Sequence, residues 1–147
     1  EMFKILATLI YEGILASQSK FVLRCLLKLR ILLLKFANPV ITLKYNSFTL
    51  SFPFSHTIFY YQKLYPQYDM QLHKIAKYIK DTFGNLNMID VGANIGDTVV
   101  FTNIKNASYL LIEGEKSYAN LISKNIYANY NQKISIKEAS MGGGNDK

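Results

Sequence analysis

The stretch MIDVGANIGDTVVF, residues 88–101, predicts the fold of the C-terminal half of the chain. A short apolar run ends at Asp90, and two glycines, Gly92 and Gly96, follow it. Glycine has no Cβ, so the backbone there can turn sharply and a ligand can approach it closely. An apolar strand that leads into a glycine loop and a helix is typical of parallel α/β sheets. Such sheets bind ligands beyond the carboxyl ends of their strands.

The segments around this loop repeat the same alternation of strand and helix. The patterns predict strands at 86–91, 108–113 and 133–140, and helices at 72–83, 96–105 and 116–130. Strands that alternate with helices imply parallel pairing and a doubly wound sheet. Further upstream, residues 41–52 alternate around Asn46, which predicts a β-hairpin. Residues 56–72 predict a loop with a short helix.

The loop lacks the features of a phosphate-binding loop. Its spacing is G-x-x-x-G, which matches neither dinucleotide nor P-loop signatures, and no lysine follows. Asp90 and Asp97 flank it and would repel a phosphate, but they suit a cationic amine. Glu113 ends the second predicted strand, near the spacing at which an acid binds ribose hydroxyls. The implied ligand is a nucleoside with an amino group, and S-adenosylmethionine fits this description.

Each of these residues also has a purely structural interpretation. The glycines could be ordinary turn residues, Asp90 could brace the loop, Asp97 could be a favourable first-turn charge, and Glu113 could be a solvated strand end. We interpret Glu115 as solvated and Asn125 as a helix-end residue. His56 and His73 have no clustered acids near them in sequence, so we predict no metal site.

Two motifs resemble those of the FkbM-type family of S-adenosylmethionine-dependent methyltransferases. Residues 90–98, DVGANIGDT, look like the family's first motif, which commonly reads D-V-G-A-N-x-G. Residues 110–126, LLIEGEKSYANLISKNI, resemble its second motif, with Glu113 and Asn125 in place. Residues 52–69 look like the lead-in of bacterial members from polysaccharide gene clusters. The resemblance covers about residues 40–147. One departure is Glu113-Gly114-Glu115-Lys116, where the family often has E-P-N-P.

The resemblance implies a fold, an activity and a set of contacts. The fold is α/β, a Rossmann-like doubly wound parallel sheet of class I methyltransferases, preceded by an N-terminal helix and a short β-hairpin. The chain supplies about the first three of the seven strands, so we expect it to be incomplete and inactive alone, with strand 86–91 as an exposed edge.

The activity that the resemblance implies is O-methylation of a sugar or glycan-precursor hydroxyl, with S-adenosyl-L-methionine as cofactor. The catalytic base remains unassigned. The expected cofactor contacts are Asp90, Gly92, Ala93, Asn94, Gly96, Asp97, Thr98, Glu113, Gly114, Ala139 and Ser140, the last two at the adenine edge by analogy.

The N-terminal half differs in charge from the half that carries the loop. The 147-residue chain has a net charge of +7 and a single cysteine, Cys25, which excludes an internal disulfide framework. The excess of basic residues lies before residue 81.

The pattern of residues 2–36 predicts one helix, and its basic residues share a narrow sector of the helix surface: Lys20, Arg24, Lys28 and Lys35. Its uncharged runs are too short for a transmembrane helix, which needs roughly 20 residues. It therefore either packs on a neighbouring domain or subunit, or lies on a membrane surface. Without a base-stacking platform, nucleic acid is not an expected partner.

These observations divide the chain into an amphipathic helical region at 1–37, a lead-in at 38–84 and a partial cofactor-binding domain at 85–147. We expect a cytoplasmic protein with peripheral membrane contact through residues 2–36, and a small-molecule or glycan acceptor as substrate. An alternative function is a membrane-surface or partner-binding module with a vestigial nucleotide site. A nicotinamide-dependent enzyme is a third possibility, which the loop spacing disfavours.

Overall fold

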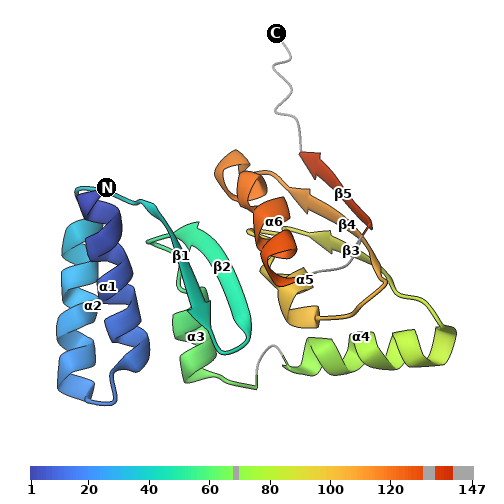
Figure 1. The fold of residues 1–147 in the computed structure, drawn as a ribbon, viewed down its shortest axis with the longest axis horizontal. Coiled ribbons are helices and arrows are strands. Elements are labelled where there is room, and N and C mark those ends of the chain that lie inside the picture. Colours follow the sequence, from blue (N-terminus) through green and yellow to red (C-terminus); the bar gives the residue numbers. More distant parts are fainter. Residues whose placement is uncertain (68–69, 131–134, 141–147) are drawn as a thin grey trace, which may run out of the picture. The chain divides into compact units, whose positions relative to one another are not determined.

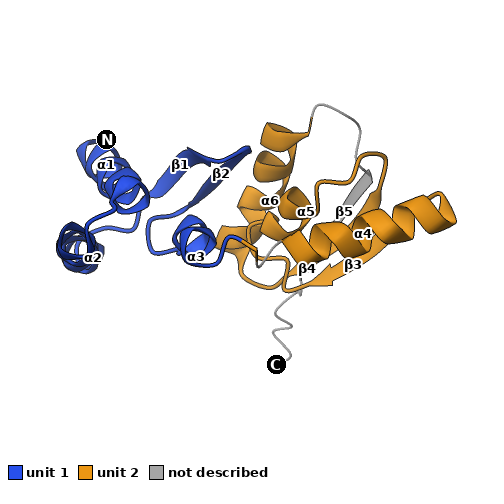
Figure 2. Ribbon diagram, turned by 90° about the horizontal axis from the view of Figure 1, so that it is seen from below, with its two compact units in different colours: residues 1–66 blue, residues 67–147 orange. Residues whose placement is uncertain are grey.

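A computed structural model of the chain describes residues 1–67, 70–130 and 135–140. The chain forms two compact units, Glu1–Pro66 and Gln67–Lys147 (Figure 2). Helices and strands occur in both units, so the protein is of the α/β type (Figure 1). The helix at 70–83, which falls within the predicted lead-in at 38–84, belongs to the second unit.

The N-terminal unit contains three helices and a two-stranded antiparallel sheet. In chain order its elements are α1 (Met2–Ala16), α2 (Lys20–Leu34), β1 (Val40–Tyr45), β2 (Phe48–Pro53) and α3 (Ile58–Leu64). The predicted hairpin is confirmed, with Asn46 at its turn in the left-handed region at φ 53°. The short helix predicted within 56–72 is also confirmed as α3.

The prediction of one continuous helix over residues 2–36 is wrong. The chain leaves the helical conformation at Ser17, whose backbone is extended, and re-enters it after Ser19. Ser19 caps α2, because its hydroxyl oxygen accepts a hydrogen bond from the Val22 N–H at 3.5 Å. Serine favours such caps over helix interiors, since its hydroxyl competes for backbone groups. Two helices therefore replace the single predicted one.

Aromatic side chains and one buried cation form the core of this unit. The rings of Tyr11 and Phe59 each meet Phe52 edge-on, at centroid distances of 5.1 and 5.6 Å. Arg30, only 9% exposed, donates hydrogen bonds to the carbonyl oxygens of Phe54 and Ser55. Its guanidinium also lies 5.9 Å from the centre of the Tyr11 ring. The charge is thus held by carbonyl dipoles and aromatic faces.

In the part of the C-terminal unit that the structure describes, a three-stranded parallel sheet packs with helices. Its elements are α4 (Met70–Phe83), β3 (Asn87–Val91), α5 (Asp97–Thr102), β4 (Ser108–Glu113), α6 (Lys116–Asn129) and β5 (Ser135–Ser140). The strand order is β3-β4-β5 and both pairs are parallel. This confirms the predicted parallel pairing, and β3 lies at one edge of the sheet that the described residues form. Residues 133–134 of the third predicted strand lie outside the described residues.

The two faces of this sheet differ in how exposed their side chains are. The strand register places Met88 and Asp90 beside Tyr109 and Leu111, which are 2% and 0% exposed. The alternate residues of β3, Ile89 and Val91, are 67% and 72% exposed. Asp90 therefore points to the covered face of the sheet, the side on which Thr98 of α5 reaches it.

Helix α5 is shorter than the predicted segment 96–105. It has six residues and ends where Asn103 adopts a left-handed conformation at φ 50°. Asparagine tolerates this conformation because its short polar side chain can bond locally. The shorter helix has a smaller macrodipole, because the macrodipole is the sum of aligned peptide dipoles. Its positive N-terminal end therefore attracts a negative group at the glycine loop less strongly.

Candidate functional site

The glycine loop lies at the carboxyl ends of β3 and β4, where a parallel sheet binds ligands. Gly92 and Gly96 have φ values of 79° and 80°, and Asn94 between them has 52°. The N–H groups of Gly92 and Ala93 both donate to the carbonyl oxygen of Ile112, at 2.8 and 3.0 Å. The loop is therefore pinned across the end of β4 rather than extending freely into solvent.

The two glycines have different surroundings. A Cβ at Gly96 would lie 3.4 Å from backbone and side-chain atoms of Ile122, so this glycine lets α5 approach α6. A Cβ at Gly92 would meet no protein atom within 4 Å. Gly92 thus needs glycine for its backbone conformation alone, and the space above it is open to a ligand.

Glu113 ties the loop to β4. Its Oε2 accepts a hydrogen bond from the Asn94 N–H, and its Oε1 accepts one from the Glu115 N–H, both at 2.7 Å. The side chain is therefore not a simply solvated strand end, and sequence patterns alone did not predict these contacts. A carboxylate has about four lone-pair sites, so both oxygens keep acceptor capacity for hydroxyl donors.

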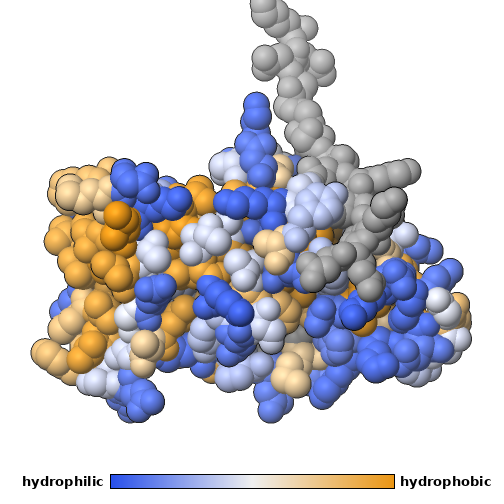
Figure 3. All heavy atoms as spheres, viewed as in Figure 1, coloured by the Kyte–Doolittle hydropathy of each residue, from blue (hydrophilic) through white to orange (hydrophobic). Residues whose placement is uncertain are grey.

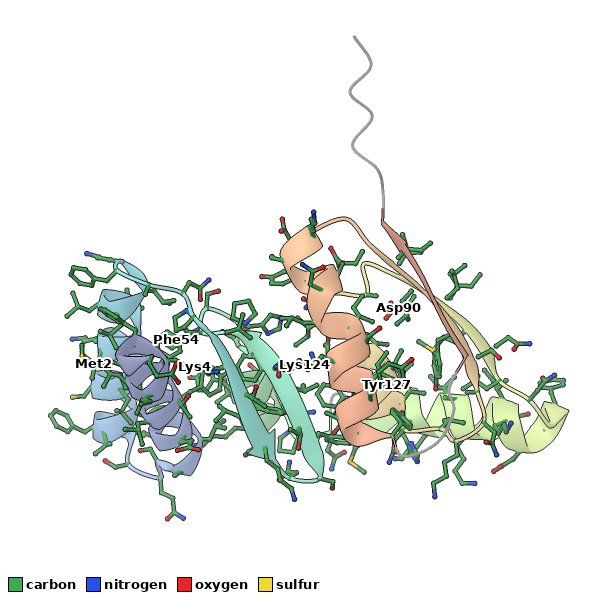
Figure 4. The ribbon with its side chains drawn as sticks, turned by 45° about the horizontal axis from the view of Figure 1, so that its top comes forward. Met2, Lys4, Phe54, Asp90, Lys124 and Tyr127 are labelled. Atoms are coloured by element: carbon green, nitrogen blue, oxygen red, sulfur yellow. The ribbon has the colours of Figure 1, made fainter. Side chains whose placement is uncertain are left out.

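Asp90 has one bonded and one unbonded carboxylate oxygen at the start of the loop. Its side chain is half-buried, and its Oδ2 has no hydrogen-bond partner among the described residues. Burial raises the pKa of Asp90 above its ordinary value; a hydrogen bond with Thr98 opposes this rise and the negative charge of Glu113 adds to it. Figure 4 labels this side chain in the C-terminal unit. Because an unpaired carboxylate is costly to desolvate, Asp90 is suited to a donor that comes from outside the chain.

The remaining predicted contacts surround the same edge of the sheet. Asp97 and Thr98 open α5, Ala93 is buried, and Gly114 is exposed directly after β4. The register pairs Ala139 with Ile112 and Ser140 with Glu113. The backbone therefore brings these two residues to the carboxyl end of β4, while their side chains lie outside the described part of the structure.

Asn125 has a role that the sequence pattern does not predict. The pattern indicates a helix-end residue, but Asn125 lies inside α6 and is 0% exposed. Its Nδ2 donates to the carbonyl oxygen of Ile95 at 2.9 Å, which fixes the glycine loop from the side of α6. The sequence does indicate that Asn125 lies on the apolar face of the predicted helix, since it follows Leu121 by four residues and Ile122 by three.

The described residues contain no group of three or more His, Cys, Asp or Glu side chains that could hold a metal ion. A comparison with protein-family models finds no match to this chain, and a comparison with curated proteins finds none either. The features that indicate a function are therefore those of the loop: an open glycine, an unpaired buried carboxylate oxygen, and a glutamate with spare acceptor capacity at the next strand end.

Proposed function

We propose that residues 90–98 and Glu113 bind S-adenosylmethionine, and that the chain supplies the cofactor-binding part of an O-methyltransferase. The observation that carries the proposal is the buried Oδ2 of Asp90, which has no partner among the described residues beside an open glycine backbone. An ammonium group is the donor that best offsets a desolvated carboxylate. A diphosphate would meet the like charges of Asp90 and Glu113 instead.

Separate parts of the ligand are assigned to separate residues. The amino-acid end would lie over Gly92 and donate to Asp90, and the ribose hydroxyls would donate to Glu113. By analogy with the FkbM-type family, Ala139 and Ser140 would flank the adenine. When bound, S-adenosylmethionine supplies an electrophilic methyl group on a sulfonium. The chain's own contribution is to bind and orient this group, and we assign no catalytic base.

The finer parts of the proposal come from the resemblance. They are the Rossmann-like class I fold, the FkbM type, and a sugar or glycan-precursor hydroxyl as acceptor. The parallel order β3-β4-β5 is compatible with that fold. A cytoplasmic location agrees with one free, exposed cysteine, Cys25, since reducing compartments keep thiols unpaired.

The test is a calorimetric titration of S-adenosylhomocysteine into the full chain, with NADH as the comparison ligand. We expect saturable binding of S-adenosylhomocysteine alone. Asp90→Asn should weaken it about ten- to a hundredfold, the value of a charge-assisted hydrogen bond. Asp81→Asn, which removes an exposed carboxylate of α4, is the matched control and should leave the affinity unchanged.

Three results would contradict the proposal. One is a folded chain, by circular dichroism, that releases no heat with S-adenosylhomocysteine. Another is an Asp90→Asn variant that binds as tightly as the wild type. Saturable binding of NADH would instead favour a nicotinamide-dependent enzyme.

A further inference from the structure

Helix α1 carries large apolar side chains on two opposite faces. One face packs into the N-terminal unit through the buried residues Ala7, Ile10, Tyr11 and Ile14. Away from that face, Met2, Ile5 and Leu9 are 76%, 56% and 59% exposed. A surface helix that needed only to cover its own core would place polar residues there.

Helix α2 extends this apolar surface. Its only buried residue is Arg30, and its exposed apolar residues are Phe21, Val22, Leu29, Ile31 and Leu32, followed by Phe36 just after the helix. The helices approach closely where Gly13 faces Leu26. Near Phe36 a hollow of about 360 Å³ between the helices is lined by apolar residues alone. Figure 3 shows hydrophobic residues gathered over α1 and α2.

A row of cations borders the apolar surface. Arg24, Lys28 and Lys35 repeat at helical spacing and are exposed, with Lys20 at the start of α2. None of these four lies within ion-pair distance of a carboxylate in the described ranges of the chain. Helix α2 itself contains no acidic residue, and residues 1–66 carry eight Lys/Arg against two Asp/Glu, a net charge of +6.

We propose that the α1–α2 hairpin docks on an anionic phospholipid surface, with Met2, Ile5, Leu9, Phe21, Leu32 and Phe36 in the interface and the basic row at the headgroups. Apolar side chains bordered by lysine and arginine are the chemistry of interfacial helices. Long basic side chains can bury their stems and keep their charges at the headgroups. This inference concerns a different unit from the cofactor site and does not depend on it.

The charge decides between a lipid surface and a second copy of the chain. Two apposed copies would bring two units of +6 together, whereas anionic lipids neutralise the same charge. No helix in the described ranges has the length and apolar character needed to cross a bilayer, so we expect the hairpin to lie along the interface.

The experiment is co-sedimentation of the full chain with phosphatidylcholine vesicles, with and without phosphatidylserine. We expect binding that phosphatidylserine strengthens at least about tenfold and that high salt weakens. The apolar test variant is Phe21→Ser with Phe36→Ser, at positions 75% and 71% exposed. Its matched control is Tyr78→Ser with Phe83→Ser on α4, at 68% and 70% exposed. Only the first pair should lose binding to both vesicle types.

A second pair of variants tests the charge. Arg24→Glu with Lys28→Glu should abolish the phosphatidylserine effect. The control is Lys74→Glu with Lys124→Glu, which changes the net charge of the chain equally at exposed positions of the other unit. Since all eight positions are exposed, circular dichroism should show unchanged folding.

The proposal is overturned if the wild type does not sediment with vesicles, or if test and control pairs lose binding alike. It is also overturned if analytical ultracentrifugation shows a dimer that Phe21→Ser with Phe36→Ser dissociates while vesicle binding is absent. That result would assign the surface to a second copy.

Discussion

Each unit of the molecule contains a desolvated charge, and the two charges are treated differently. In the N-terminal unit Arg30 is 9% exposed, yet the carbonyls of residues 54–56 accept its hydrogen bonds and aromatic rings flank it. In the C-terminal unit Asp90 is only half-buried, yet one of its oxygens has no partner in the described chain. The more deeply buried charge is the better satisfied one.

This difference favours a structural role for Arg30 and agrees with the binding role that we propose for Asp90. A buried charge that is fully hydrogen-bonded stabilises one conformation, because every alternative leaves its partners unsatisfied. A charge left unsatisfied lowers stability, and such local costs concentrate at sites where a ligand completes the bonding. The comparison therefore predicts opposite effects when each charge is removed.

Removal of the Arg30 charge should produce the largest change. Arg30→Met keeps the aliphatic stem but removes the guanidinium donor from the carbonyl oxygens of Phe54 and Ser55, whereas the carbonyl oxygen of His56 keeps its hydrogen bond from the Tyr11 hydroxyl. We expect the free energy of unfolding to fall by about 3 kcal/mol, measured by urea denaturation of the full chain. The control Lys28→Met, on the exposed side of the same helix, should change it by less than about 0.5 kcal/mol. Equal stabilities of the two variants would show that Arg30 is not structural.

The loop support by Asn125 should give the next largest effect. Asn125→Leu removes the donor to the Ile95 carbonyl inside the C-terminal unit, and this should lower the free energy of unfolding by about 2 kcal/mol. Asn120→Leu is the matched control, because Asn120 lies on the exposed side of α6. If Asn125→Leu is as stable as its control, another group must hold the loop.

The glycines of the site form a graded series. Gly96→Ala combines a left-handed backbone with a Cβ at 3.4 Å from Ile122, so we expect the free energy of unfolding to fall by about 2 kcal/mol. In Gly92→Ala only the left-handed backbone is unfavourable, so we expect the free energy of unfolding to fall by about 1 kcal/mol. Gly114→Ala has neither a left-handed φ nor a close neighbour and should be nearly neutral. Thermal unfolding of the three variants measures this series. A midpoint for Gly96→Ala at or above that for Gly92→Ala would contradict the role of Gly96 in helix packing.

These examples show what could be predicted from the sequence. The alternation of strand and helix predicted β3, β4 and α6 to within a residue or two, because periodicity reports which face of an element is buried. The positions of Asp90, Gly92 and Glu113 at strand ends followed from the same pattern. All of these predictions depend on local spacing along the chain.

The failures depend on hydrogen bonds between distant residues or at element ends. The break at Ser17–Ser19 depends on one serine cap within an otherwise apolar helical pattern. The bonds of Glu113 to Asn94 and of Asn125 to Ile95 join residues 19 and 30 positions apart. Periodicity marks such polar residues as exposed or terminal, since it cannot show which backbone group lies opposite them.

The smallest effect, and the opposite sign, is expected at Asp90. Asp90→Asn removes an incompletely bonded carboxylate, so at pH 7 it should raise the free energy of unfolding, by up to about 1 kcal/mol after allowance for solvent screening. The raised pKa of Asp90 means that the folded state holds this proton to higher pH than the unfolded state. The wild type therefore loses stability relative to the variant as pH rises from the ordinary carboxyl pKa through the raised one, and the two converge below that window. Urea denaturation at several pH values measures this difference, with Asp81→Asn as the control.

Saturating S-adenosylhomocysteine should reverse the order of stability and make the wild type more stable than Asp90→Asn, because only the wild type gains the charge-assisted hydrogen bond to the ligand. If Asp90→Asn stays the more stable protein at saturating ligand, the buried carboxylate lowers stability without contributing to binding.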